Sequence, residues 1–222
     1  MLVHGAFVDG SGWKGVRDLL IADSYRVAVV QNSTSSLAGD VAVTRQVLDG
    51  LDGPAVLVGH SYGGVVITEA GNHPNVAALA YVAAYVPDEG ESLSTLIGEA
   101  PSDAPAPPIL PPADGFLFLD RDGFAAAFAA DAPDDVTAFM ADSQVGLGVD
   151  AVTAVISEAA WRTKPSWYLL TTSDRMIPPA QQHTMSERAK ATVTETASSH
   201  AVFVAHPAVV AQLIKEAASA AT

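Results

Sequence analysis

The chain contains no cysteine, which excludes disulfide bridges, thiolate metal sites and cysteine nucleophiles together. Basic residues are also scarce. The 11 lysines and arginines stand against 25 acidic residues, and a net charge of −14 disfavours binding to nucleic acid. No apolar run reaches the roughly 20 residues that a membrane span needs, and the N-terminal sequence MLVHGAF lacks the basic and apolar regions of a signal peptide. We therefore expect a cytoplasmic protein that binds neither nucleic acid nor membranes.

What the 222-residue chain does contain is apolar sequence, since 49% of its residues are hydrophobic and only 16% are charged. This balance excludes an intrinsically disordered protein. Short apolar runs alternate with helix-like stretches, which predicts an α/β fold with a mostly parallel sheet of about six strands flanked by helices. The expected strands are Met1–His4, Arg26–Val30, Ala55–Gly59, Leu79–Ala84, Ser166–Thr171 and Thr192–Thr196. The expected helices are Gly12–Ala22, Leu37–Gly50, Gly63–Asn72, Gln181–Lys190 and Pro207–Ala218.

The alternation breaks in the second quarter of the chain and resumes only near its last quarter. Ala100–Asp114 is rich in proline and alanine, so it can form neither a regular helix nor a central strand. Helical patterns follow at Gly123–Ala130, Pro133–Asp142 and Asp150–Ala160. We expect residues 87–164 to be a helical cap inserted into a single core domain of residues 1–86 and 165–222.

A nucleophile motif lies between a predicted strand and a predicted helix. Gly59–Gly63 reads GHSYG and matches G-x-S-x-G, with the strand sequence AVLVG before it and the helix-like GVVITEAG after it. A sharp strand-to-helix turn needs glycine where a side chain would collide, and it exposes the serine hydroxyl at the carboxyl end of the sheet. Ser61 is therefore the predicted nucleophile.

A serine nucleophile needs a base, and the chain has six histidines. His200 follows the last predicted strand in a short loop, which places it at the same edge of the sheet as Ser61. We therefore expect His200 to be the base. The remaining histidines are expected to pack in the core, to cap helices or to lie on the surface: His4, His60, His73, His183 and His206.

The third member of such a triad is an acid that orients the histidine. Asp174 follows the predicted strand Ser166–Thr171, again at the carboxyl edge. The chain order serine, aspartate, histidine is the one expected of a hydrolase built on this kind of sheet. Asp88, which follows the preceding sheet strand, is a geometrically possible alternative.

Charge that develops on a substrate oxygen needs fixed hydrogen-bond donors. The residue after the nucleophile, Tyr62, is expected to supply one backbone N–H. The turn after the first strand is expected to supply the other from Ala6, with Phe7 as the alternative, and Gly5 there lets the backbone approach the substrate closely.

Four segments together resemble the α/β-hydrolase fold superfamily: LVHGAF, GHSYGG, SDRMIPP and SSHAVF. The nearest resemblance is to small bacterial esterase-like members related to plant methylesterases and hydroxynitrile lyases, and it covers almost the whole chain. The resemblance implies a nucleophile, an acid, a base and two oxyanion donors at Ser61, Asp174, His200, Ala6 and Tyr62 respectively. It also implies that residues 87–164 correspond to the variable cap of the family.

The chain departs from this family at its start, because members usually carry residues before LVHG and often an extra antiparallel strand or hairpin. Ser61 argues against haloalkane dehalogenases and epoxide hydrolases, which have aspartate in place of the serine in this strand-to-helix turn. Hydroxynitrile lyases that resemble this group have threonine at Gly5 and lysine at Ala201, so neither lyase feature is present.

The sequence therefore predicts a serine hydrolase that cleaves a small carboxylic ester or lactone through an acyl-enzyme. An acyltransferase, a cofactor-free perhydrolase and a non-catalytic ligand-binding protein remain alternatives. No metal cluster, P-loop or dinucleotide fingerprint is visible, so neither metal nor cofactor is expected. A small-molecule substrate is the expected partner, and the chain is expected to be a monomer or a homodimer. The expected pocket residues are Phe7, Met176, Ile177 and Trp161, with Tyr62, Phe116, Phe118 and Phe139 as further candidates.

Overall fold

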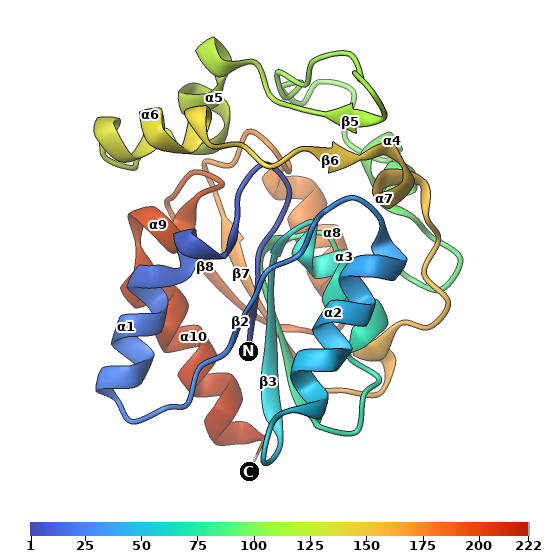
Figure 1. Ribbon diagram of the computed structural model, residues 1–222, viewed down its shortest axis with the longest axis vertical. Coiled ribbons are helices and arrows are strands. Elements are labelled where there is room, and N and C mark those ends of the chain that lie inside the picture. Colours follow the sequence, from blue (N-terminus) through green and yellow to red (C-terminus); the bar gives the residue numbers. More distant parts are fainter. Residues whose placement is uncertain (222) are drawn as a thin grey trace.

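Six parallel strands form the central sheet of the computed structural model, which describes residues 1–221 (Figure 1). Their order across the sheet is β2-β1-β3-β4-β7-β8. The strands are β1 (Leu2–Val3), β2 (Val29–Val30), β3 (Ala55–Ser61), β4 (Val76–Ala84), β7 (Ser166–Thr171) and β8 (Thr192–Thr196). Every pairing in this sheet is parallel, so the prediction of a mostly parallel sheet of about six strands is confirmed.

Helices cover both faces of the sheet, because parallel neighbours must be joined by crossovers (Figure 1). On one face lie α1 (Lys14–Ala22) and α10 (Pro207–Ala220), and on the other lie α2 (Leu37–Asp49) and α3 (Gly63–Ala70). The remaining elements of the core are the 3-10 turn η1 (Gly10–Trp13), α8 (Pro179–Arg188) and α9 (Val202–Ala205). Proline begins α8 and α10, where its missing N–H costs nothing. Within residues 1–221, no helix is both long and apolar enough to cross a membrane.

The central strands are buried on both faces, which explains their continuous apolar sequence. Leu79, Tyr81 and Val82 of β4 have no exposed surface. The hydroxyl of Tyr168 on β7 reaches across and donates to the carbonyl of Ala84 at 2.7 Å. A buried phenol that would otherwise lose its water is thereby satisfied, and the two strands are fastened together.

The first two strands are shorter than the sequence predicted. Met1–His4 and Arg26–Val30 contract to Leu2–Val3 and Val29–Val30, and at the carboxyl end of β1 side-chain hydrogen bonds replace the backbone ladder. Asn32 donates from its side chain to the carbonyl of His4 at 3.2 Å and from its amide to His4 Nε2 at 3.0 Å. The backbone is held by these bonds, so the strand pairing ends.

Most residues between β4 and β7 lie across one end of the sheet, and the last of them run beside α3 to the start of β7 (Figure 1). They contact the loops that follow β1, β2 and β8, which identifies this end as the carboxyl end. The contacts join Phe7 to Val145, Gly148 to Thr34, and Ala201 to Phe128. The elements here are α4 (Leu93–Gly98), β5 (Phe116–Leu117), α5 (Arg121–Phe128), α6 (Asp134–Asp142), β6 (Leu147–Gly148), α7 (Val149–Thr153) and the 3-10 turn η2 (Ala160–Arg162).

Two predictions in this segment can be compared directly with the structure. Ala100–Asp114 contains no helix and only isolated bridges, as its prolines require. The predicted helix Asp150–Ala160 is wrong beyond Thr153, because Val155 pairs with Ser92 and the amide of Ile156 donates to Glu91 at 2.9 Å. This tertiary pairing overrides the local helical pattern.

Candidate active site

The turn from β3 into α3 places Ser61 at the carboxyl end of the sheet in a strained conformation. Its φ is +54°, in the left-handed region that a residue with a side chain rarely adopts. A Cβ at Gly59 would lie 2.5 Å from the carbonyl oxygen of Gly63, and one at Gly63 would lie 2.8 Å from that of His4. The glycines of GHSYGG are therefore required by close backbone contact, as the sequence predicted.

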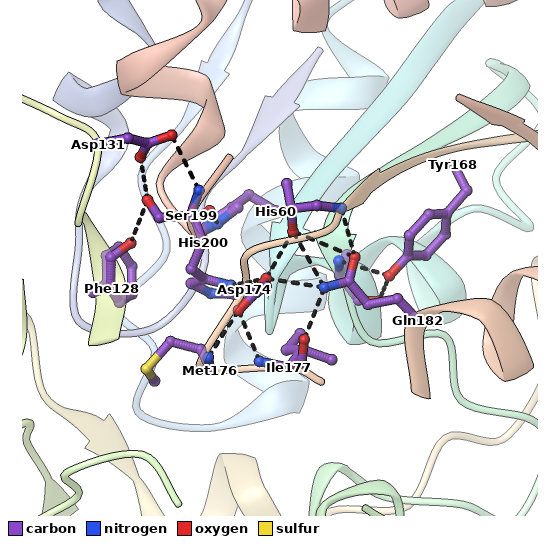
Figure 2. A network of polar contacts seen from close by, with 12 residues as sticks. His60, Phe128, Asp131, Tyr168, Asp174, Met176, Ile177, Gln182, Ser199 and His200 are labelled. Atoms are coloured by element: carbon purple, nitrogen blue, oxygen red, sulfur yellow. Dashed lines mark hydrogen bonds and ion pairs between the residues drawn. The ribbon is translucent and has the colours of Figure 1, made fainter. Parts of the chain in front are cut away.

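A buried histidine–aspartate pair lies at the same end of the sheet (Figure 2). His200 Nδ1 is 2.8 Å from Asp174 Oδ2, and neither side chain has exposed surface. A carboxylate oxygen can only accept here, so Nδ1 carries the proton and Nε2 keeps its lone pair. Nε2 is buried and has no hydrogen-bond partner within residues 1–221. A free basic nitrogen therefore remains on His200.

Four further donors surround the carboxylate of Asp174. Those of Met176, Ile177 and Gln182 can be followed in Figure 2. Oδ1 accepts the amides of Met176 and Ile177 at 2.8 and 2.9 Å. Oδ2 accepts from Thr171 Oγ1 at 2.9 Å and from Gln182 Nε2 at 3.0 Å. The backbone turn DRMI thus positions the acid, and α8 contributes Gln182 from eight residues further along.

The loop that carries His200 is fixed by the segment between α5 and α6 (Figure 2). Asp131 accepts the amide of Ser199 at 3.1 Å and also the hydroxyl of Ser199. The amide of Ala201 donates to the carbonyl of Phe128 at 2.8 Å. Both neighbours of His200 are therefore held by residues that the chain places over the sheet.

His60, next to the predicted nucleophile Ser61, packs against His200 and binds its backbone. Its Nε2 donates to the carbonyl of His200 at 3.0 Å, and the two rings lie with centroids 4.6 Å apart. Burial, and secondly the nearby His200, hold the pKa of His60 well below its usual range. Burial also lowers the pKa of His4, whose Nδ1 contacts the carbonyl of Gly5 at 2.9 Å.

These two buried histidines predict loss of stability in mild acid. A depressed folded pKa means that only the unfolded chain gains a proton as pH falls below about 6.5, so the free energy of unfolding falls with pH. One such group changes this slope by up to about 1.4 kcal/mol per pH unit. The free energy of unfolding, measured with urea between pH 7 and pH 5, should depend less steeply on pH for His60→Gln than for the unaltered protein. His183→Gln, at a half-exposed side chain, is the control. Equal slopes for the unaltered protein and His60→Gln would contradict the prediction.

Two unpaired backbone amides lie at the turns after β1 and β3. Within residues 1–221, neither Ala6 nor Tyr62 donates its amide to another group. The amide of Phe7 donates to the carbonyl of Val145 at 3.1 Å, so this alternative donor is already occupied. Phe7 also has a φ of +65°, which turns the chain sharply after Ala6.

The side chain of Tyr62 is anchored by a buried acid that the sequence analysis did not identify. Its hydroxyl donates to Asp40 Oδ2 at 2.8 Å, and Asp40 Oδ1 accepts the amide of Thr34 at 3.0 Å. Burial raises the pKa of Asp40, against the hydrogen bonds from Tyr62 and Thr34. Asp40 lies in the first turn of α2, where the helix dipole favours a carboxylate. That first-turn position was the one signal available in the sequence.

A cavity of about 280 Å³ opens beside Ser61 and is lined mainly by apolar side chains. The predicted pocket residues Phe7, Met176 and Ile177 line it, as do Tyr62 and the proline-rich stretch from Pro101 to Pro107. A larger hollow of about 710 Å³ lies at the opposite, amino end of the strands beside Met1 and Pro54, far from the predicted triad. We therefore place the candidate active site at the smaller cavity.

The prediction for Trp161 is wrong, because this residue does not line the cavity. Its indole Nε1 donates to the carbonyl of Pro87 at 2.8 Å, and Arg162 lies over its ring. Phe116, Phe118 and Phe139 also lie outside the lining, and Phe139 is 65% exposed.

The alternative acid and the other outer histidines have partners elsewhere. Asp88 binds the guanidinium of Arg162 through both oxygens at 2.8 and 2.6 Å, away from His200. The three outer histidines each face a carboxylate, in the pairs His73–Asp49, His183–Glu195 and His206–Asp131. Of the predicted triad, Asp174 and His200 contact each other directly, and Ser61 lines the cavity at the same end of the sheet.

Comparisons with known proteins bear on the fold and the family. A sequence model of the alpha/beta hydrolase family matches residues 1–213. A carbendazim hydrolyzing esterase from Nocardioides sp. (strain SG-4G) is 32% identical over 114 residues, which are 45% of this chain and 47% of that esterase. The match thus spans about half the length of that curated relative.

Solved structures with the same fold cover nearly all of the chain. A pyrethroid hydrolase from Sphingobium faniae JZ-2 superposes with a TM-score of 0.81 at 23% identity, over 99% of this chain and 96% of that one. Polyneuridine aldehyde esterase superposes with a TM-score of 0.81 at 17% identity, over 97% of this chain and 96% of that one. A methylesterase protein from Arabidopsis gives 0.80 at 18% identity, over 98% of each chain. These likenesses concern the fold, and they agree with the resemblance to esterase-like members inferred above. The family match over residues 1–213 establishes that this chain belongs to the alpha/beta hydrolase family.

Proposed function

We propose that this protein is a serine hydrolase that cleaves a small carboxylic ester or lactone through an acyl-enzyme. One observation carries the proposal above the others. The strained Ser61 and the buried His200–Asp174 pair lie at one end of the sheet, and His200 Nε2 has no partner within residues 1–221. This nitrogen is on the side of the ring opposite the bond to Asp174, so it is available to accept a proton.

The proposed reaction begins when Ser61 Oγ attacks the ester carbonyl carbon and His200 Nε2 accepts the hydroxyl proton. The amides of Ala6 and Tyr62 donate to the oxyanion of the tetrahedral intermediate. Asp174 stabilises the resulting imidazolium through Nδ1–H. The intermediate collapses, the C–O bond to the alcohol breaks, and His200 returns the proton to the departing alkoxide.

Water completes the cycle. His200 Nε2 accepts a proton from a water molecule as its oxygen attacks the acyl carbon, and the second tetrahedral intermediate releases the carboxylic acid and Ser61 Oγ–H. For a lactone, the alcohol and the acid belong to one product molecule. No step requires a metal ion or a cofactor.

The cavity supports a substrate that is small and largely apolar. About 280 Å³ lies between Ser61 and the residues that follow β4, and we propose that residues 87–164 act as the cap of the core formed by residues 1–86 and 165–222. The name of the Nocardioides relative, an esterase that hydrolyses carbendazim, also supports hydrolysis of an ester-like bond. Its partial match does not extend that substrate to this chain.

Acyl transfer to an alcohol or to peroxide would use the same acyl-enzyme, and a receptor role would need no base. A chain-length panel of p-nitrophenyl esters, followed by mass spectrometry with a fluorophosphonate probe, tests the proposal. We expect turnover in water and a phosphonyl adduct on Ser61. Turnover that appears only when an alcohol or peroxide is added would favour acyl transfer or perhydrolysis. An unlabelled Ser61 with no turnover would overturn the proposal.

A further inference from the structure

Two polar side chains in the cavity beside Ser61 have no part in the reaction proposed above. The lining is otherwise apolar, and its polar side chains are Ser61, Tyr62, Tyr85 and Gln181. Ser61 is the proposed nucleophile, and the Tyr62 hydroxyl is bound to Asp40. Tyr85 and Gln181 therefore need another explanation.

Tyr85 is attached directly to the nucleophile turn. Its amide donates to the carbonyl of Ser61 at 3.2 Å, and a Cβ at Gly64 would collide with its carbonyl oxygen. The residue is only 8% exposed. Its hydroxyl makes no hydrogen bond with any of residues 1–221, and it is not among the fully buried atoms, so it keeps some accessible surface. Burial, and secondly the charge of Asp174, raise the pKa of Tyr85, so the phenol keeps its proton and can donate.

Gln181, in the first turn of α8, offers the complementary group. Its Nε2 donates to the carbonyl of Leu96 in α4, which fixes the orientation of the amide. Oε1 is then an acceptor, and it has no partner within residues 1–221 although the side chain is 95% buried, being 5% exposed. Buried polar atoms are rarely left without a partner, and the exceptions require a specific explanation.

We propose that Tyr85 and Gln181 form a polar subsite that binds a substituent of the substrate carrying both a hydrogen-bond acceptor and a donor, such as a hydroxyl group. The Tyr85 hydroxyl donates to the substituent, and the substituent donates to Gln181 Oε1. This inference rests on the proposed hydrolase function and narrows its substrate to apolar esters with one such polar substituent.

The chemistry of the pair favours this class over a charged group. Among residues 1–221, no lysine, arginine or histidine lines the cavity, so a carboxylate on the substrate would find no counterion. A purely apolar substrate would cut the Gln181 carbonyl oxygen and the Tyr85 hydroxyl off from water and give neither group a hydrogen-bond partner. A neutral group with one donor and one acceptor satisfies both.

The test uses pairs of esters matched in size. Methyl 3- and 4-hydroxyphenylacetate are compared with the corresponding methylphenylacetates, and methyl 6-hydroxyhexanoate with methyl heptanoate. We expect the largest ratio of kcat/KM, hydroxy over methyl, to be about tenfold or more, as the loss of one or two neutral hydrogen bonds implies. Tyr85→Phe and Gln181→Met should each lower that ratio about tenfold. Tyr81→Phe is the matched control, because its hydroxyl bonds to Thr68 outside the cavity, and it should leave the ratio unchanged.

A binding measurement separates this inference from the proposed function. Calorimetry with the Ser61→Ala variant and the same intact esters should show about tenfold tighter binding of the preferred hydroxy ester, and adding Tyr85→Phe should abolish the difference. That result would support the subsite even if the unaltered protein hydrolysed none of the esters. Ester turnover with ratios near one, or ratios that neither substitution changes, would overturn the subsite and leave the hydrolase function intact.

Discussion

Replacing Ser61 by alanine is expected to lower kcat for ester hydrolysis by about three to six orders of magnitude, with the fold unchanged. The substitution removes only the hydroxyl group, so no acyl-enzyme can form. The residual rate would come from the unpaired amides of Ala6 and Tyr62, which still polarise the bound carbonyl. Initial rates with a p-nitrophenyl ester, together with circular dichroism and Tm, measure both parts of this expectation.

Ser173→Ala is a suitable control for that experiment, because Ser173 is exposed and next to Asp174 in the chain. It should retain full activity. Labelling by the fluorophosphonate probe should be lost in Ser61→Ala and kept in Ser173→Ala. If a correctly folded Ser61→Ala protein hydrolysed esters at the normal rate, Ser61 would not be the nucleophile.

Replacing Asp174 by asparagine is expected to lower kcat about 10⁴-fold. Both carboxylate oxygens face donors, since Oδ1 accepts the amides of Met176 and Ile177 and Oδ2 accepts from His200, Thr171 and Gln182. An asparagine must turn its NH₂ group toward one of these sets. With its oxygen on the two backbone amides, its NH₂ group donates to His200 Nδ1, which moves the ring proton to Nε2. His200 could then no longer accept the proton of Ser61.

The matched control is Asp88→Asn, which breaks an ion pair with Arg162 far from the histidine. It should keep near-normal kcat. Active-site titration before the rate measurement corrects both variants for unfolded protein. Near-normal activity in Asp174→Asn with an inactive Asp88→Asn would move the acid to the loop after β4 and refute the assignment.

The positions of Ser61, Asp174 and His200 could be predicted because each lies at or just after the end of a strand that the apolar pattern of the sequence indicates. The runs that became β3, β7 and β8 are short, and proline precedes two of them, at Pro54 and Pro165. Parallel strands end at one edge, so residues just beyond them converge without any knowledge of side-chain contacts. The same rule applied to β4 would have pointed to Tyr85, which directly follows Ala84.

The segment over the sheet was harder to predict, because its structure depends on contacts between residues distant in the chain. The stretch after Thr153 has a helical pattern but pairs with Glu91 and Ser92, about 60 residues earlier. Trp161 has the size and polarity of a pocket residue. It donates instead to the carbonyl of Pro87, a contact that the sequence does not reveal. Asp40 likewise acquires its role from Tyr62, which no periodicity connects to it.

The loop around His200 donates hydrogen bonds to Asp131 and to the carbonyl of Phe128, so the α5–α6 part of the covering segment is tied to this loop. Moving that part away would break the bonds to both neighbours of His200, the proposed base. Across residues 99–107, by contrast, the backbone makes only local hydrogen bonds within the described chain, and its prolines have no N–H to add. If the proposed hydrolase function holds, we therefore expect substrate and product to exchange past the proline-rich stretch, where the cavity can open without breaking the hydrogen bonds that hold His200.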